Sequence, residues 1–115
     1  MSLDLAAVTF DCDDPQQVAA FWKEALGRTI DDGARAFFVS LSGGPGAPKL
    51  FFIKVPEPKT VKNRVHLDLH TADRAVEVDR LLALGATRVA DHEEHGIVWT
   101  TLRDVEGNEF CVAAD

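Results

Sequence analysis

Apolar and polar residues alternate without interruption along residues 65–70, with the sequence VHLDLH. Side chains of a strand point alternately to its two faces, so this pattern predicts a strand with one apolar face. The opposite face carries two imidazoles and a carboxylate, from His66, Asp68 and His70. The predicted apolar face consists of Val65, Leu67 and Leu69.

Two segments show the 3.6-residue period of amphipathic helices, and we predict helices over Pro15–Leu26 and Ala75–Leu84. Each follows an aspartate that can cap the helix N-terminus, and the first opens with a proline, which suits the first helical position. A glycine ends each helix, at Gly27 and Gly85. Trp22, in the first helix, is expected in the core or at a dimer interface.

Apolar runs bounded by turn residues predict the remaining strands. These are Leu5–Cys12, Arg28–Ile30, Ala36–Leu41, Lys49–Val55, Ala86–Ala90, Ile97–Leu102 and Glu109–Ala113. Residues 91–96 (DHEEHG) are interpreted as a solvated hairpin loop, not a metal motif, because its histidines do not share a helix face. Phe37 and Phe38 are neighbours in a predicted strand and should point to opposite faces.

The two halves of the chain resemble each other. Ala7–Asp11 aligns with His66–His70 at an offset of 59 residues (66 − 7), and both helices end in Ala-Leu-Gly. Such regularity indicates an internal duplication of a βαβββ unit. We predict one domain over 1–115, with module one at about 4–56, a proline-containing linker at about 57–62 and module two at about 63–115.

Composition narrows the function classes. The chain has 115 residues, of which 46% are hydrophobic, and a net charge of −7. An acidic chain lacks the basic surface of a nucleic-acid-binding protein, and no apolar run is long enough to span a membrane. We expect no nucleic-acid or membrane partner and a cytoplasmic location. Cys12 and Cys111 are expected to be buried, reduced thiols.

The duplicated unit, the aspartate-opened helices, the Ala-Leu-Gly helix ends and the turn at residues 104–110 (DVEGNEF) resemble the glyoxalase/bleomycin-resistance/dioxygenase superfamily, also called vicinal oxygen chelate proteins. The run at residues 55–69 is similar to its small bacterial glyoxalase-like domain branch. The resemblance implies an α+β fold of two βαβββ modules. About eight strands would curl around a cleft, with one helix outside each half, and the protein would form a homodimer.

The resemblance also implies where a divalent metal would bind, on the first and last strands of each module. In this chain the first-strand positions are Ala7 and His66, and the last-strand positions are Cys111 and either Phe52 or Ile53. Only His66, with Cys111 as a second candidate, offers a donor atom. None of Asp11, Asp68 and His70 replaces the missing ligands in an obvious way. We therefore predict no metal site and no cofactor.

The functional prediction is a protein that binds a small organic molecule in the cleft between the modules. The predicted ligand-binding residues are His66, Asp68, His70, Trp99, Cys111 and Thr9. The alternative is a glyoxalase-like lyase, isomerase or dioxygenase. It would use a divalent metal, or His66 as an acid/base with Asp68 beside it. A purely structural module is a third alternative.

Overall fold

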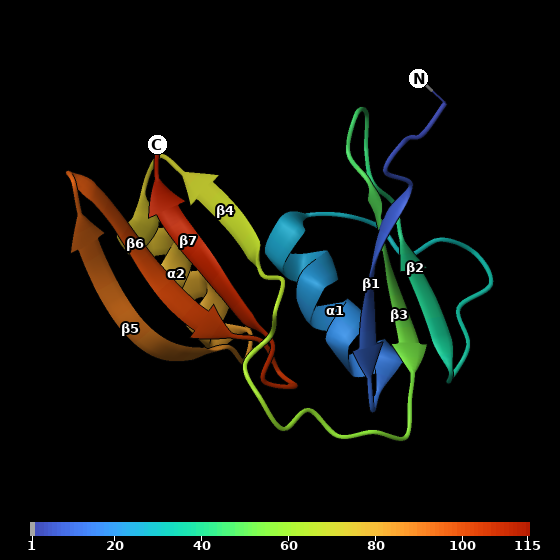
Figure 1. The fold of residues 1–115 in the computed structure, drawn as a ribbon. Coiled ribbons are helices and arrows are strands. Elements are labelled where there is room, and N and C mark those ends of the chain that lie inside the picture. Colours follow the sequence, from blue (N-terminus) through green and yellow to red (C-terminus); the bar gives the residue numbers. More distant parts are fainter. Residues whose placement is uncertain (1) are drawn as a thin grey trace. The chain divides into compact units, whose positions relative to one another are not determined.

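The computed structural model describes residues 2–115, which form seven strands and two helices (Figure 1). The elements are β1 Ala7–Cys12, α1 Pro15–Leu26, β2 Phe38–Leu41, β3 Lys49–Lys54, β4 Leu67–Thr71, α2 Arg74–Ala83, β5 Thr87–Glu94, β6 Ile97–Arg103 and β7 Glu109–Ala114. The predicted α+β class and the duplicated module are confirmed. The first compact unit ends at Lys59, and the second is Thr60–Asp115.

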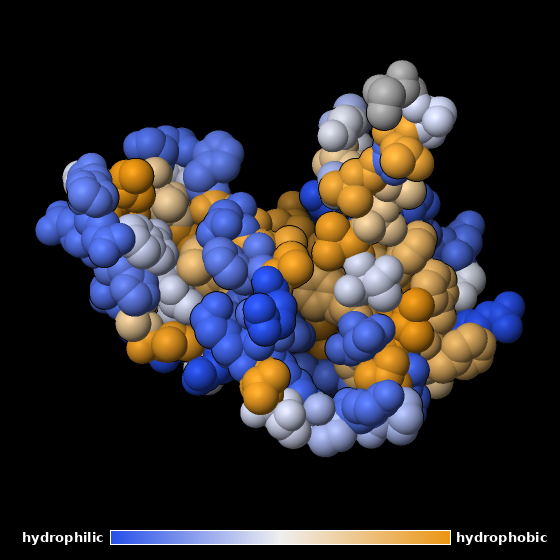
Figure 2. Space-filling view, in the orientation of Figure 1, coloured by the Kyte–Doolittle hydropathy of each residue, from blue (hydrophilic) through white to orange (hydrophobic). Residues whose placement is uncertain are grey.

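The first unit is a three-stranded sheet in the order β1-β3-β2, with β1 parallel to β3 and β2 antiparallel to it. Helix α1 packs on one face of this sheet, and Trp22 is buried there against Phe10 and Phe21, as predicted for a core residue. In Figure 2, apolar side chains cover much of the visible surface of this unit.

The second unit repeats this plan with one more strand. Its sheet has the order β4-β7-β6-β5, in which β4 is parallel to β7 and the other pairs are antiparallel. Helix α2 covers one face of the sheet (Figure 1). Buried side chains on that side include Leu81, Leu102, Phe110 and Val112. Helix α2 therefore does not cover the opposite face of this sheet.

Both helices begin and end close to the predicted positions. The carboxylates of Asp14 and Asp73 accept hydrogen bonds from backbone N–H groups three residues on, which satisfies donors that a helix N-terminus leaves unpaired. Gly27 ends α1 with φ of 65°, a conformation that favours glycine.

Two predictions in the first unit are wrong. The expected strand at Arg28–Ile30 is reduced to a single bridge between Ile30 and Leu41, so the described residues hold seven strands, not eight. Strand β2 starts at Phe38, because Phe37 lies in the turn that joins Arg35 to Phe38. Phe38 contacts Phe51 on the face away from α1, and Phe37 is exposed.

Two strand boundaries in the second unit also differ from prediction. Strand β4 is Leu67–Thr71, so Val65 precedes it and is 75% exposed instead of lying in the core. Strand β5 continues to Glu94, and the hairpin turn is only His95-Gly96, with φ of 52° and 79°. Such two-residue turns match the twist of paired strands, which lets pairing continue to the end of the hairpin. Exposed polar side chains line β5 (Figure 2).

An ion-pair network ties β5 to its surroundings. The Asp91 carboxylate accepts hydrogen bonds from the Thr100 hydroxyl at 2.7 Å and from the Arg88 guanidinium at 2.9 Å, and Arg74 lies 3.6 Å away. The Thr100 hydrogen bond, followed by the charges of the two arginines, lowers the pKa of Asp91 from its ordinary value of 3.8.

Replacing Asp91 by Asn is expected to lower the urea midpoint at pH 7. A carboxyl group whose pKa is lower in the folded than in the unfolded protein stabilises the fold at pH values above its unfolded pKa. This stabilisation disappears as the pH falls through the folded-state pKa. The difference between wild type and Asp91→Asn should therefore shrink below about pH 3.8. Urea midpoints measured from pH 2 to 7 check this, with Glu93→Gln on the same strand as control. A difference that stays constant down to pH 2 contradicts it.

No helix within residues 2–115 has both the length and the apolar character needed to cross a membrane.

Candidate functional site

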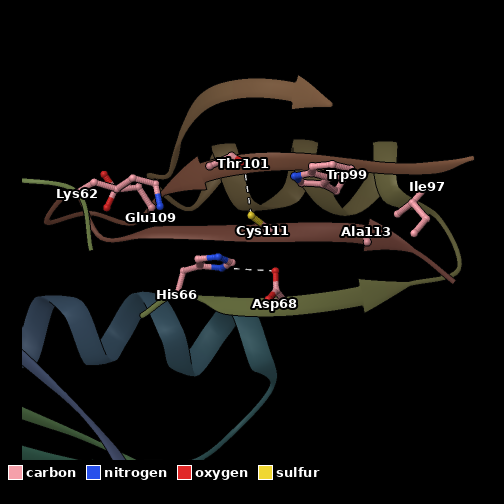
Figure 3. A pocket seen from close by; sticks show the side chains of 9 residues that line it. All are labelled: Lys62, His66, Asp68, Ile97, Trp99, Thr101, Glu109, Cys111 and Ala113. Atoms are coloured by element: carbon pink, nitrogen blue, oxygen red, sulfur yellow. Dashed lines mark hydrogen bonds and ion pairs between the residues drawn. The ribbon is translucent and has the colours of Figure 1, made fainter. Parts of the chain in front are cut away.

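A cavity of about 470 Å³ lies on the face of the second sheet opposite α2 (Figure 3). Its volume falls within the range of small-molecule sites, roughly 300–1,000 Å³. The side chains that line it are Lys62, His66, Asp68, Ile97, Trp99, Thr101, Glu109, Cys111 and Ala113. All of them belong to the second unit.

Strand alternation places most of these side chains. On β6, Trp99 and Thr101 point into the cavity, while Thr100 between them is fully buried on the α2 side. On β7, Cys111 lines the cavity and its neighbour Phe110 points to the core. Each strand therefore contributes to the cavity with one face and to the core with the other.

The indole of Trp99 forms an aromatic wall together with His92. Trp99 and His92 are direct partners across β5 and β6, and their rings stack with centroids 5.0 Å apart and an interplanar angle of 23°. The stack exists because β5 extends through residues that the sequence assigned to the hairpin loop. His92 therefore supports the cavity wall, and is not a loop residue.

Polar side chains gather at the start of β4 and on the neighbouring β7 and β6. His66 Nδ1 lies 3.5 Å from Asp68 Oδ1, and the Thr101 hydroxyl lies 3.4 Å from Cys111 Sγ (Figure 3). One ligand atom from each of His66, Asp68 and Cys111 lies within 4.8 Å of the others. An imidazole, a carboxylate and a thiol thus converge at one place in the cavity.

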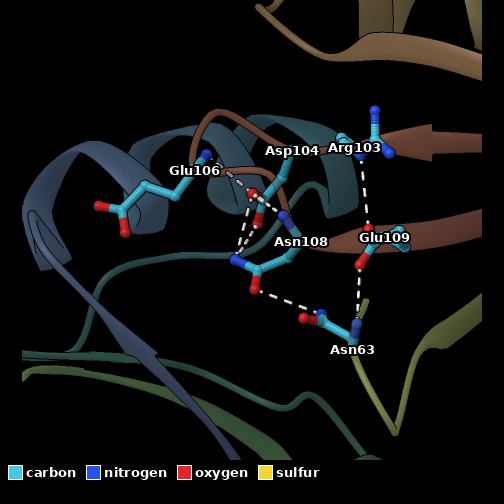
Figure 4. A network of polar contacts seen from close by, with 6 residues as sticks. All are labelled: Asn63, Arg103, Asp104, Glu106, Asn108 and Glu109. Carbon is cyan, nitrogen blue, oxygen red and sulfur yellow. Dashed lines mark hydrogen bonds and ion pairs between the residues drawn. The ribbon is translucent and has the colours of Figure 1, made fainter. Parts of the chain in front are cut away.

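Glu109 forms the end of the cavity and is held in place by neighbouring groups. One carboxylate oxygen accepts a hydrogen bond from the Asn63 backbone N–H at 2.9 Å, and the other accepts one from the Arg103 guanidinium at 3.4 Å (Figure 4). Glu109 is only 7% exposed. Its charge is therefore compensated by protein groups, so we assign Glu109 a structural role at the cavity edge.

Four of the six predicted ligand-binding residues line this cavity, namely His66, Asp68, Trp99 and Cys111. His70 shares their strand face, but its Nδ1 contacts the Asp115 carboxylate instead. Thr9 lies on β1 of the first unit and stays a prediction. Cys111 is half-buried, so the prediction of two buried thiols is correct for Cys12 alone; neither thiol is disulfide-bonded.

Five lining residues were not predicted from the sequence: Lys62, Ile97, Thr101, Glu109 and Ala113. The signal for most of them was present as the i, i+2 spacing with Trp99 on β6 and with Cys111 on β7. Lys62 lies before β4 in a segment without regular structure, and no periodicity marks it.

Sequence comparison matches residues 7–113 to the family described as "Glyoxalase-like domain". The chain belongs to the glyoxalase-like domain family. The match covers both repeat modules and confirms the resemblance to the glyoxalase/bleomycin-resistance/dioxygenase superfamily. A search of curated proteins found no match.

Solved structures with the same fold include enzymes and a binding protein. One is a glyoxalase/bleomycin resistance protein/dioxygenase family enzyme from Burkholderia phytofirmans PsJN, with a TM-score of 0.81, 20% identity, and coverage of 97% of this chain and 98% of that one. TnmS3, an antibiotic binding protein from Streptomyces sp. CB03234, has a TM-score of 0.71, 16% identity, and coverage of 99% and 98%.

A third similar structure holds a metal. It is a mutant of the fosfomycin resistance protein FosX from Listeria monocytogenes, complexed with Mn(II) and dihydroxypropylphosphonic acid. Its TM-score is 0.79 at 10% identity, with coverage of 98% of this chain and 90% of that one. At these identities the three structures establish the fold alone.

The metal set that the superfamily implies does not fit this glyoxalase-like chain. Thr9 pairs with Phe51, and its repeat counterpart Asp68 (68 − 9 = 59) pairs with Cys111. Phe51 is therefore the structural counterpart of Cys111. The predicted counterparts of Cys111, Phe52 and Ile53, were wrong because the register between the first and last strands differs by one residue between the two modules.

Phe52, one of those predicted counterparts, is fully buried against Phe10 in the core of the first unit. Ala7 and Phe51 have no donor atoms, so the four-ligand set is reduced to His66 and Cys111. The structure places Asp68 beside these two residues, although the repeat alignment had not included it in the ligand set. The second module therefore contributes a set of three donor residues.

Proposed function

We propose that this glyoxalase-like protein binds a small organic molecule in the cavity over β4, β6 and β7. The observation that carries the proposal is the combination of one aromatic wall with a few convergent polar groups in a space of about 470 Å³. The sequence predicted a ligand between the modules, whereas the proposal here concerns the cavity of the second module alone. The antibiotic-binding neighbour supports a role in binding for this fold.

The cavity favours a flat ligand with one polar end. The indole of Trp99 is backed by His92 and offers a rigid face for stacking, and Ile97 and Ala113 extend the apolar wall. His66 and Asp68 line the cavity on the β4 side and can exchange hydrogen bonds with a ligand hydroxyl, amide or carbonyl. A ligand of this kind needs no metal ion to be held.

Trp99→Ala is expected to weaken the affinity for such a ligand by about tenfold or more, because it removes the stacking surface. A screen of aromatic metabolites by ligand-observed NMR on the full chain finds the ligands, and titration gives their dissociation constants. Trp99→Phe should retain most of the affinity.

His70→Ala changes β4 outside the cavity and serves as the control. Ligands that bind wild type and Trp99→Ala equally would place the site elsewhere. A screen without any hit would favour a purely structural role.

A second candidate is an enzyme of the glyoxalase-like type, in which His66 acts as an acid/base or as a metal ligand. The contact between His66 and Asp68 favours it, since a carboxylate next to an imidazole can orient the ring for proton transfer. Mass spectrometry of the screened ligands after incubation separates the two candidates, because an enzyme converts its ligand and a binding protein returns it unchanged.

The proposal also includes a homodimer and a cytoplasmic location. The homodimer follows from the family resemblance, and the location follows from the two cysteines without a disulfide. The mass of the protein in solution tests the first.

A further inference from the structure

Cys111 differs from the other cysteine of the chain in its surroundings. Cys12 is 3% exposed and its thiol lies 3.6 Å from the Ile53 carbonyl oxygen, within the first unit. Cys111 is half-buried, lines the cavity, and has the imidazole of His66 and the carboxylate of Asp68 around it. Partial exposure beside a base is the setting in which cysteines react.

We propose that Cys111 is a nucleophile that adds to a small, soft electrophile bound in the cavity. His66 accepts the thiol proton, and Asp68 is a positioning residue that orients the imidazole. The inference rests on the proposed function, because the electrophile is the ligand of the same cavity. Nucleophile, base and orienting carboxylate are the three parts that activated nucleophiles share across unrelated folds.

The contacts of the three groups suit a thiol nucleophile with a base and a hydrogen-bond donor beside it. His66 Nδ1 faces Asp68 at 3.5 Å, which leaves Nε2 as the nitrogen free of this contact. Cys111 Sγ lies 3.4 Å from the Thr101 hydroxyl, which can donate a hydrogen bond to a thiolate. The imidazole nitrogen that does not face Asp68 is therefore the candidate acceptor of the thiol proton.

The electrophile that fits these walls is an α,β-unsaturated carbonyl compound. A conjugated molecule is flat and can stack on Trp99, which is backed by His92. The sulfur attacks the β-carbon and forms the S–C bond, while the electron pair of the C=C bond moves toward the carbonyl as an enolate. The proton taken from the thiol by His66 is returned to the α-carbon. Nothing is oxidised, and no further reactant is required.

The test is the rate of covalent modification by benzylideneacetone, a flat aromatic enone, followed by mass spectrometry of the intact full-length protein. Wild type should gain one adduct, located on Cys111 by peptide mapping and absent in Cys111→Ser. The rate should saturate with enone concentration. Cys12 serves as the internal control and should stay unmodified while the protein is folded.

The role of His66 is tested by the pH dependence of the rate. His66→Gln should slow modification by about tenfold or more at pH 7 and make the rate rise only at higher pH, where the thiol ionises unaided. Asp68→Asn should shift the pH–rate profile in the same direction by a smaller amount. His70→Gln, on the same strand but outside the cavity, should match wild type. Equal pH–rate profiles for wild type and His66→Gln overturn the proposal.

Two further results separate this inference from the proposed function. If wild type binds ligands of the NMR screen but gains no adduct, the proposed binding function stands and the nucleophile is refuted. If purified wild type carries stoichiometric zinc that is lost on changing His66, Asp68 or Cys111, the three side chains are metal ligands, and the nucleophile is refuted in this case too.

Discussion

Phe110→Ala is expected to lower the free energy of unfolding by about 3 to 5 kcal/mol, the largest effect expected for a single change in the second unit. Phe110 is 1% exposed on β7 and lies between Leu67 of β4 and Leu102 of β6 in the sheet. Its truncation removes a ring from the core beneath α2 and leaves a cavity that a packed sheet cannot close. Cys111, the next residue, points to the other face and keeps its own side chain.

Chemical denaturation followed by circular dichroism measures this loss. Phe37→Ala is the matched control, since Phe37 is 58% exposed and its ring lies against the Arg35 guanidinium at the surface. The control should lose less than about 1 kcal/mol. If both variants lose a similar amount of unfolding free energy, Phe110 does not lie in the core of the second unit.

Asp104→Ala is expected to cost about 2 to 3 kcal/mol, the second largest effect. Asp104 is 3% exposed, and its carboxylate accepts hydrogen bonds from the backbone N–H groups of Glu106 and Asn108 and from the Asn108 side-chain amide, at 2.9 to 3.2 Å (Figure 4). Alanine leaves these donors without their acceptor in the turn that leads into β7.

Asp104→Asn separates the hydrogen bonds from the charge. Its amide oxygen can still accept from the backbone, but its NH₂ group meets the Asn108 amide, so a loss of about 1 kcal/mol is expected. Asp79→Ala, on the exposed side of α2, is the neutral control and should change the unfolding free energy by less than about 0.5 kcal/mol. If Asp104→Ala is as stable as Asp79→Ala, the turn does not depend on this carboxylate.

The network in Figure 4 also connects the turn to the cavity. Asn108 accepts a hydrogen bond from the Asn63 amide at 3.3 Å, and the Asn63 backbone N–H donates to Glu109 at the cavity end. Asp104 therefore stabilises the segment that starts β7 with its cavity-facing residues. We expect the loss of Asp104 to slow the modification of Cys111 as well as to lower stability.

The local sequence determined the features that depend on neighbouring residues. Helix α1 begins at the aspartate-proline pair and ends at Gly27, because capping and positive φ act within a few residues. The repeat indicated the duplicated fold, and the two-residue period of β6 and β7 already contained the division into core and cavity faces, although the sequence alone did not assign it. Strand alternation and the repeat, together with the family resemblance, identified His66, Asp68, Trp99 and Cys111 as candidate site residues.

The tertiary structure decided what depends on pairing between distant segments. The stack of His92 on Trp99 requires the β5–β6 register, and the counterpart of Cys111 is Phe51 because the strands of the first module pair one residue out of step with those of the second. The meeting of Cys111 with His66 and Asp68 depends on the parallel pairing of β4 with β7, the first and last strands of the second unit. Local patterns assign a side chain to a face, but only strand pairing determines which side chains on that face lie within reach of one another.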